Sequence, residues 1–328
     1  MAKKPLSIFG ISEINGRKII NISPLSGGVS SEIYKVDTQY KSFCIKKALK
    51  KLKVKKIWKA DTIRSYYEYI WLKKVKKIFP KSVPEVFKYD RKKNFLVLEY
   101  LDTKKYSVLK NNLLKGKVDY RVISVLSKKL SVIHANLKSN NNKKIFQKHN
   151  YNFIKLRIDP YLFELRKNYS GLNTYIKQVT ENLIKNQNTV IHGDFTPKNI
   201  LIGSKNQIIL DAEVASYGDP SFDIVSILNH LFIKTIFVKK NKNKLIKGLK
   251  VCYDSYFNNV TWEDKQDLIK RSNFLLPGMI LARIDGKSPV EYLTQKKDKN
   301  KLRKIALELI EADDYDFDTV ANSLVNEK

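Results

Sequence analysis

The chain has 328 residues, more than one hydrophobic core usually supports, so we expect two lobes or domains. Its formal net charge of +31 is a feature of many nucleic-acid-binding proteins, but lysine predominates over arginine along the whole chain and no RNA- or DNA-binding motif accompanies the charge. No apolar run approaches the roughly 20 residues of a membrane span, and residues 1–5 lack the features of a secretory signal. These observations predict a cytoplasmic protein with no membrane partner and no specific nucleic-acid partner.

Residues 18–101 are expected to form a small antiparallel sheet, because β-rich or alternating segments are separated by Gly, Pro, Asp or Asn. These segments are 18–23, 32–38, 40–46, 85–89 and 95–100. One helix is expected at 63–79, where Tyr67, Trp71 and Val75 belong to an apolar pattern of helical spacing behind a possible cap at Asp61 or Thr62.

After Asp102 helical periodicity predominates. The segments with this pattern are 121–136, 173–185, 222–237, 243–257, 262–274 and 298–312, and strand-like runs occur at 189–192, 200–202 and 207–210. Strands first and helices later predict an α+β protein of two lobes, residues 1–101 and 102–328. The Asn/Lys-rich stretch 138–148 is expected to be an exposed loop or insertion.

The segment 189–222, TVIHGDFTPKNILIGSKNQIILDAEVASYGDPSF, carries the most chemical information. A short apolar strand leads to His192-Gly193-Asp194, Asn199 follows five positions after Asp194, and a second apolar run ends at Asp211. Phosphoryl transfer needs a carboxylate that orients the attacking hydroxyl and oxygen ligands that hold Mg²⁺ on the nucleotide phosphates. Asp194, Asn199 and Asp211 would supply these groups.

This segment resembles the catalytic and metal-binding loops of aminoglycoside phosphotransferases, choline kinases and methylthioribose kinases, where HGDxxxxN replaces the HRDxxxxN of protein kinases and Asp-x-Glu stands in place of DFG. The resemblance implies a bilobal protein-kinase-like fold that uses ATP and Mg²⁺, with a nucleotide-binding first lobe and a catalytic, substrate-binding second lobe. Asp194 would be the catalytic base, Asn199 and Asp211 would bind Mg²⁺, and Glu213 would assist the metal or the substrate. KKALKKLKV and DAEVASYGDPSFD resemble methylthioribose kinase in particular, from which the chain departs by retaining Asn199.

Other readings of these residues stay open. The plainer reading of Asp194 and Asp211 is that they end strands and cap turns, although two motifs in order at strand ends favour the functional reading. Asp219 before Pro220 is typical of a helix N-cap. The resemblance implies that Asp223 supports the backbone of the catalytic loop. We expect His192 to be a packed, hydrogen-bonded residue and not an acid or base.

The first lobe contains residues suited to a nucleotide. Gly27 and Gly28 lie between two predicted strands, where a turn would present backbone N–H groups to phosphates or would simply close a hairpin. Lys46 ends a strand at the spacing where kinases place their phosphate-binding lysine, and alternation puts the competing Lys47 on the other face. Glu68 is the expected partner of Lys46.

Two further segments are compatible with ligand contact or with a plainer role. Glu99 and Leu101 belong to a strand and hinge that resemble the adenine-binding segment, although an ordinary strand end fits equally. The lysine-rich stretch 46–59 is more typical of a solvated basic face.

Substrate-binding residues are expected after Tyr217. Arg283 and Asp285 either contact substrate or form an intrahelical charge contact next to a C-cap at Gly286. The acidic residues 308–318 form either a solvated tail or a subsite for a cationic substrate.

The sequence thus predicts an ATP-dependent phosphotransferase that acts on a hydroxyl of a small soluble metabolite, such as a sugar, an amino alcohol or an aminoglycoside-like compound. The alternatives are a catalytically inactive nucleotide-binding scaffold and a basic nucleic-acid-binding protein. The acceptor and the oligomeric state are left open.

Overall fold

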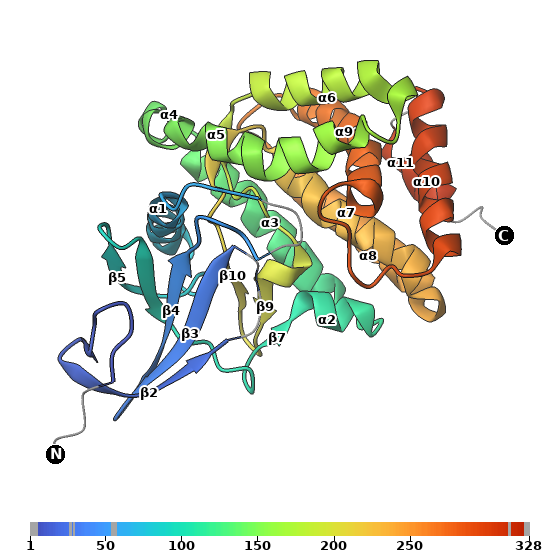
Figure 1. Ribbon diagram of the computed structural model, residues 1–328. Coiled ribbons are helices and arrows are strands. Elements are labelled where there is room, and N and C mark those ends of the chain that lie inside the picture. The colour runs from blue at the N-terminus through green and yellow to red at the C-terminus, as the bar shows by residue number, and fades with distance from the viewer. Residues whose placement is uncertain (1–5, 26–27, 29, 54–57, 314–315, 325–328) are drawn as a thin grey trace. The chain divides into compact units, whose positions relative to one another are not determined.

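A computed structural model describes residues 6–324 apart from 26–27, 29, 54–57 and 314–315. It divides into two compact units (Figure 1). The N-terminal unit ends at Tyr106 and also includes residues 203–213, which lie within the second lobe of the sequence prediction. The C-terminal unit comprises 107–202 and the chain from Val214 onward.

The N-terminal unit is built on a six-stranded antiparallel sheet of order β1-β2-β3-β4-β6-β5. Its strands are β1 (Glu13–Ile14), β2 (Arg17–Pro24), β3 (Ser31–Thr38), β4 (Ser42–Ala48), β5 (Val86–Asp90) and β6 (Phe95–Glu99). Val36, Phe43, Ile45, Phe95 and Val97 form the centre of a buried apolar cluster on this sheet. Because strand residues alternate between faces, the same pattern places Lys46 on the opposite face of β4 from Ile45.

Helix α1 (Arg64–Ile78) lies beside β4 and β5 in this unit (Figure 1). It buries Tyr67, Trp71 and Val75, the apolar positions that predicted it, and also the carboxylate-bearing Glu68. The five predicted strands and the helix are therefore confirmed. The short β1 was missed because two residues carry no readable alternation. Strand β10 (Gln207–Ile209) also belongs to this unit.

The C-terminal unit is mainly helical. Its α-helices are α2 (Leu109–Leu114), α3 (Tyr120–Leu137), α4 (Asn140–Phe146), α5 (Asn150–Phe153), α6 (Asn173–Lys185), α7 (Ser221–Phe237), α8 (Lys242–Phe257), α9 (Lys265–Asp285), α10 (Lys296–Glu311) and α11 (Phe317–Ser323). A π-helix, η2 (Ile154–Phe163), follows α5 directly. Two small antiparallel pairs, β7 (Ser107–Val108) with β9 (Ile200–Ile202) and β8 (Thr189–Ile191) with β11 (Ser216–Gly218), complete the unit.

Helix α7 is the centre of this unit, because it is buried along nearly its whole length and contacts α8 and α9. The apolar pattern of 222–237 predicted the helix but not its complete enclosure. The antiparallel N-terminal sheet and the mostly helical C-terminal part confirm the predicted α+β class.

Two sequence predictions are wrong in this unit. The stretch 138–148 is not an exposed loop, since α4 and the 3₁₀ turn Gln147–His149 occupy it and bury Asn142 and Phe146. The helix expected at 262–274 instead begins at Lys265 and continues through Pro277 to Asp285. Burial of the apolar residues on both sides of Pro277 outweighs the helix hydrogen bond that a proline removes.

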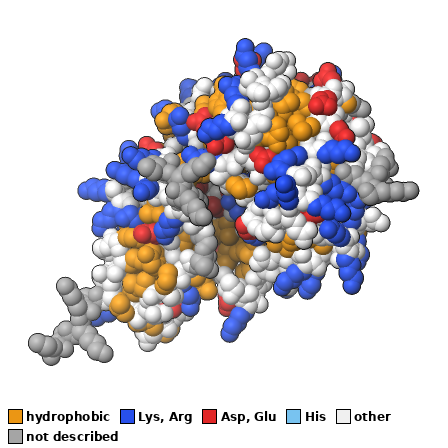
Figure 2. Space-filling view, turned by 45° about the vertical axis from the view of Figure 1, so that its right-hand side comes forward, with side chains coloured by type: hydrophobic (Ala, Val, Ile, Leu, Met, Phe, Trp, Pro, Cys, Tyr) orange, Lys and Arg blue, Asp and Glu red, His pale blue; other side chains and the backbone are white. Residues whose placement is uncertain are grey.

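The surface carries many cations. On the face shown in Figure 2, Lys and Arg side chains occur in many separate places, with Asp and Glu among them. No single helix in the described part of the chain is long and apolar enough to cross a membrane, and α7 and α8 meet that criterion only as a pair bent by 113°.

The burial of α4 can be tested by its stability contribution. Phe146 is fully buried, whereas Tyr151 in the adjoining α5 is 65% exposed. Phe146→Ala should lower the free energy of unfolding by about 3–5 kcal/mol, because it leaves a cavity, whereas Tyr151→Ala should change it by no more than about 0.5 kcal/mol. Urea denaturation followed by circular dichroism measures both. Equal, small effects would contradict the packing of α4.

Candidate active site

The loop after β8 has a backbone that only glycine allows. Gly193 has a φ of +76°, and a Cβ atom there would lie 2.7 Å from the carbonyl oxygen of Val214. Both the left-handed conformation and the contact exclude other side chains. The glycine of the His-Gly-Asp motif is thus a requirement of the fold.

Asp223, in the first turn of α7, holds this loop in place. Its carboxylate accepts hydrogen bonds from the backbone N–H groups of His192, at 2.6 Å, and Gly193, at 2.9 Å. The ring of His134 is 3.1 Å away, and both side chains are fully buried. These contacts agree with the predicted supporting role of Asp223. His192 is also buried and its Nδ1 accepts a hydrogen bond from the backbone of Asp194, as expected for a packed loop residue.

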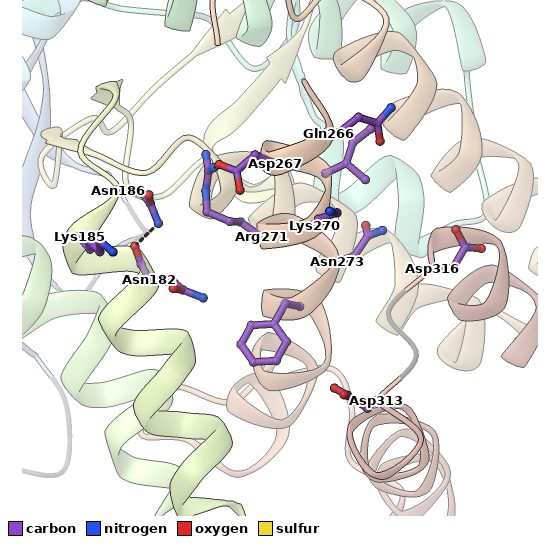
Figure 3. Close-up of a pocket in the computed structure, with 12 residues that line it drawn as sticks. Asn182, Lys185, Asn186, Gln266, Asp267, Lys270, Arg271, Asn273, Asp313 and Asp316 are labelled. Carbon is purple, nitrogen blue, oxygen red and sulfur yellow. Dashed lines mark hydrogen bonds and ion pairs between the residues drawn. The ribbon is translucent and has the colours of Figure 1, made fainter. Parts of the chain in front are cut away.

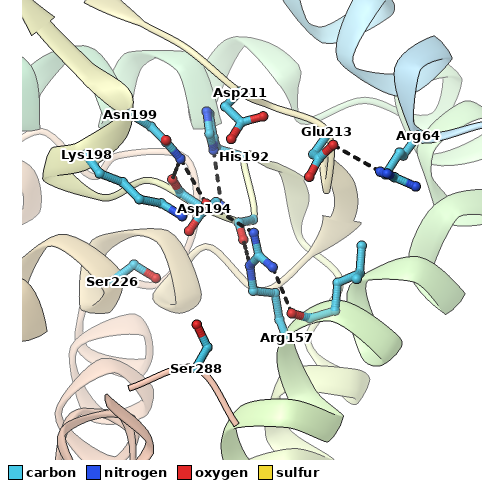
Figure 4. A network of polar contacts seen from close by, with 12 residues as sticks. Arg64, Arg157, His192, Asp194, Lys198, Asn199, Asp211, Glu213, Ser226 and Ser288 are labelled. Atoms are coloured by element: carbon cyan, nitrogen blue, oxygen red, sulfur yellow. Dashed lines mark hydrogen bonds and ion pairs between the residues drawn. The ribbon is translucent and has the colours of Figure 1, made fainter. Parts of the chain in front are cut away.

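Asp194 is a buried carboxylate between two cations (Figure 4). Its Oδ2 lies 3.2 Å from the Arg157 guanidinium and 2.9 Å from the Lys198 ammonium. Burial alone would raise the pKa of Asp194, but the charges of Arg157 and Lys198 outweigh it and hold this pKa well below its ordinary range. The carboxylate is therefore ionised at every physiological pH.

Arg157 is a site residue that the sequence did not reveal. It lies in the π-helix η2, and its guanidinium also donates to the carbonyl oxygens of Gly193, at 2.6 Å, and Leu156, at 2.7 Å. Pro160 within the same helix argues against helix continuation in a sequence-based reading. Nothing local marks Arg157, because the loop residues that it contacts, Gly193 and Asp194, lie more than 30 residues away in the chain.

Asn199 is fixed on the same loop. Its side-chain nitrogen donates to the backbone oxygen and to Oδ2 of Asp194, each at 2.9 Å. Both bonds use the nitrogen, which leaves the amide oxygen as the group for another ligand, and oxygen is the atom that Mg²⁺ prefers. The geometry fits the predicted metal role without establishing it.

A small cavity adjoins Asp194 inside the C-terminal unit. Its volume is about 10 Å³, room for one water-sized group, and its lining includes Arg157, Tyr161, Asn229, His230 and Arg283. Of the residues predicted to contact substrate, the structure places Arg283 here.

Asp285 is held elsewhere. Its carboxylate accepts hydrogen bonds from Arg303, at 2.7 and 2.8 Å, and from the Tyr169 hydroxyl, at 2.6 Å. It is absent from the lining of the cavity beside Asp194. Gly286 follows α9 as its C-cap, as the sequence suggested, although its backbone is extended.

Lys234 is a second buried cation in α7. Its ammonium donates to the His230 carbonyl and the Tyr292 hydroxyl, each at 3.2 Å. Burial lowers its pKa to about 7, with the Lys110 and Arg283 charges adding to the effect and Glu291 opposing it. The signal in the sequence was a set of polar residues, Asn229, His230 and Lys234, inside an otherwise apolar helix.

The N-terminal unit contains a separate buried ion network. Lys46 lies 2.8 Å from Glu68, as predicted, and also pairs with Asp211. Burial would lower the pKa of Lys46, but Asp211, Glu68 and Glu213 raise it above its ordinary value. Burial raises the pKa of Glu68 to about 7 against the Lys46 charge, and the other two carboxylates add to the rise. Lys47 instead lies over the ring of Phe9, so the assignment of the ion pair to Lys46 is confirmed.

Asp211 has a left-handed backbone with a φ of +67°, which is uncommon for a non-glycine residue and is often found at functional sites. Two positions later, Glu213 is 5% exposed and pairs with the fully buried Arg64 at 3.0 Å (Figure 4). Ser31 also donates to Glu213, at 3.4 Å. Glu213 thus already has protein partners, which supports a positioning role.

The other residues predicted to contact the nucleotide are two glycines of the first lobe and two residues at or just after the end of β6. Gly27 lies outside the described residues, and Gly28 has a φ of +90°, as a glycine turn requires. Glu99 ends β6 and its carboxylate accepts from the Glu85 backbone at 3.2 Å, while Leu101 is half-buried. Their contact with a nucleotide stays a prediction.

No group of three or more His, Cys, Asp or Glu side chains within the described ranges could hold a metal ion. This finding does not conflict with a magnesium site, because Mg²⁺ keeps several waters and needs only one or two carboxylates from the protein.

A wider hollow of about 740 Å³ lies between α6, α9 and the acidic residues Asp313 and Asp316 (Figure 3). Arg271 lines it and pairs with Asp219 at 3.0 Å. The N-cap of α7 is Pro220 and not Asp219 as predicted. Asp219 lies one residue earlier, where it accepts from the Ser221 backbone N–H and is half of a buried ion pair. None of the motif residues of the catalytic loop lines this hollow.

Residues 21–238 match the family model described as the phosphotransferase enzyme family. Methylthioribose kinase 1 of Oryza sativa subsp. japonica is 23% identical over 245 residues, which are 65% of this chain. The chain covers only 56% of the length of that relative.

Solved structures share the fold. Spectinomycin phosphotransferase, solved with ADP and spectinomycin, is 12% identical, with 95% of this chain and 94% of that chain covered and a TM-score of 0.51. Choline kinase from Cryptosporidium parvum Iowa II is 13% identical, with 93% and 94% covered and a TM-score of 0.53.

Lys234 predicts a pH dependence of stability. Between the folded pKa of about 7 and the ordinary value of 10.5, the unfolded chain binds a proton that the folded chain does not, so stability rises with pH in this window. Lys234→Met removes this dependence. In urea denaturation, the free energy of unfolding of Lys234→Met minus that of wild type should fall by on the order of 3 kcal/mol between pH 6.5 and pH 9.5.

The control is Lys244→Met, which makes the same change at an exposed position of α8. Its difference from wild type should be equal at both pH values. A Lys234→Met difference that is also constant with pH would show that this ammonium is not desolvated.

Proposed function

Because the chain belongs to the phosphotransferase enzyme family, we propose that it is a small-molecule kinase that transfers the γ-phosphoryl group of ATP to a hydroxyl of a small soluble metabolite. The observation that carries the proposal is the environment of Asp194. This carboxylate is buried and ionised on a loop that Asp223 fixes, and it borders a cavity. A carboxylate so placed is suited to orienting a hydroxyl group.

In the proposed reaction the acceptor hydroxyl donates a hydrogen bond to Asp194. Its oxygen attacks the γ-phosphorus, the new P–O bond forms, and the bond from phosphorus to the ADP oxygen breaks. The hydroxyl proton passes to the Asp194 carboxylate. Because Arg157 and Lys198 keep the pKa of this carboxylate low, it is a weak base, and its main contribution is to orient the hydroxyl until the P–O bond has largely formed.

Lys46 is proposed to bind the phosphates of the nucleotide. Its ion pair with Glu68 fixes the ammonium on the sheet, so little side-chain freedom is lost when an anion binds. Asp211 also contacts this lysine.

Asn199 and Asp211 are proposed to provide oxygen ligands for Mg²⁺. The ion would neutralise charge on the phosphates during transfer. Glu213, through Arg64, keeps the segment that carries Asp211 attached to the N-terminal unit.

Asp194→Asn tests the catalytic assignment. The amide keeps the shape of the side chain but cannot accept the proton, so kcat should fall by about 10²–10⁴-fold while ATP affinity changes little. ATP consumption coupled to ADP detection, over a panel of alcohols and sugars, measures kcat, and calorimetry measures ATP binding.

Asp254→Asn makes the same chemical change on the exposed face of α8 and should leave kcat unaltered. If Asp194→Asn retains wild-type turnover, the assignment of this carboxylate is wrong.

Lys46→Met tests the nucleotide site. Loss of the ammonium should weaken ATP binding by about 10- to 100-fold, because a charge-assisted contact to phosphate is lost. Lys47→Met is the matched control, since the neighbouring residue lies over the ring of Phe9 and should bind ATP as wild type does. Thermal melting of both variants shows whether they are folded. Equal ATP affinities of the two variants would contradict the role of Lys46.

A further inference from the structure

Arg283 is a buried guanidinium without an anionic partner among the described residues. It is 8% exposed, and its hydrogen bonds go to the carbonyl and hydroxyl of Ser288 and to the Tyr161 hydroxyl, while its Nε has none. Burying a charge is costly unless an opposite charge accompanies it. A guanidinium in this state is suited to binding an anion from outside the chain.

The carboxylates near Arg283 are engaged by other cations. Asp285 is paired with Arg303 at 2.7 Å, and Glu291 with Lys110 at 2.6 Å. Asp194 carries two cations of its own. The charge of Arg283 is therefore available to a ligand.

Three other buried groups of the same cavity lack hydrogen-bond partners. These are Oγ1 of Thr196, Oδ1 of Asn229 and Nδ1 of His230, and each of the three residues is at least 94% buried. Buried polar atoms are nearly always hydrogen-bonded in native proteins. Hydroxyl groups of a ligand would satisfy them, since a hydroxyl both donates and accepts.

The charges around the cavity disfavour a cationic acceptor. Its lining contains two guanidinium groups, of Arg157 and Arg283, against the single carboxylate of Asp194. The ring of Tyr161 lies 5.9 and 5.3 Å from these guanidinium carbons. An ammonium compound would find no free carboxylate here.

We propose that Arg283, which lines this cavity, binds the carboxylate of a small hydroxy acid while a hydroxyl of the same molecule faces Asp194. The inference rests on the proposed kinase function and names its acceptor class. Thr196, Asn229 and His230 would bind one further hydroxyl group of the acid, since the cavity has room for one water-sized group.

A matched three-carbon series tests the charge preference. The acceptors are glycerate, glycerol, 3-amino-1,2-propanediol and glycerol 3-phosphate, which present an acid, a neutral group, a cation and a phosphate ester on one skeleton. The six-carbon series is gluconate, glucose, glucosamine and glucose 6-phosphate. In at least one series the acid should have a kcat/KM about 100-fold above the neutral compound, as expected for a charge-assisted contact in a buried site.

Arg283→Met should raise KM for the acid by about 100-fold and so remove most of the advantage in kcat/KM that the acid has over the neutral compound. Arg166→Met removes an exposed guanidinium from the same unit and should leave both unchanged. Arg283→Lys keeps the charge and should recover part of the acid preference. Thermal stabilisation of wild type and each variant by the acids, without ATP, measures binding independently of turnover.

The outcomes separate the two proposals. If neutral or cationic compounds are phosphorylated as well as the acids, the kinase function stands and the acid assignment is wrong. If phosphate esters are preferred, the assignment to a carboxylate is overturned. If acids stabilise wild type but not Arg283→Met, and nothing is phosphorylated, the anion site stands and the kinase proposal fails. If acids neither bind nor react at millimolar concentration, the inference is rejected.

Discussion

The arrangement of the C-terminal unit depends on one buried anion, Asp194, that two cations keep ionised. A carboxylate taken out of water must be paired or protonated, and here Arg157 and Lys198 supply the pairing. Arg157 in turn donates to the Gly193 carbonyl, and Asp223 accepts from the N–H groups on the other side of the loop. The charge and the loop conformation therefore stabilise each other.

The N-terminal unit also pairs its buried charges, and it does so with residues that are remote in the sequence. Lys46 and Arg64 are buried near the sheet, and two of their carboxylate partners, Asp211 and Glu213, come from the segment 203–213. Backbone hydrogen bonds from this segment, such as that from Ile209 to Ser82 at 2.8 Å, hold it in the N-terminal unit. The buried cations of this unit thus require a segment of the chain that follows the catalytic loop.

The sequence predicted those features that local patterns encode. The spacing seen in kinases selected Lys46, and strand alternation separated it from Lys47. Glu68 was expected as its partner because it is the only acidic residue between Thr62 and Pro84, and the family motif GDPxxD located Asp223. Features that depend on distant contacts were not predicted. No sequence pattern near Arg157 predicted its ion pair with Asp194. The stretch 138–148 was predicted to be an exposed loop because it is mostly polar, but it contains helix α4, which buries Phe146.

The predicted substrate-binding residues show the same difference between local patterns and distant contacts. Arg283 was one of several polar residues at a helix end, with substrate contact and an intrahelical contact both open. Tertiary structure distinguishes Arg283 from Asp285. Asp285 pairs with Arg303, whereas no salt bridge joins Arg283 to a carboxylate among the described residues. Likewise, the sequence did not show why α7 contains polar residues. In the structure, Asn229 and His230 line the same cavity as Asp194.

Phosphorus NMR of the protein with ATP, Mg²⁺ and the acceptor series tests the central claim most directly, because it identifies where the phosphoryl group goes. Transfer to a hydroxyl predicts that a phosphate monoester signal grows together with ADP in equal amount. Formation of ADP with only inorganic phosphate, or no consumption of ATP with any acceptor, would contradict it.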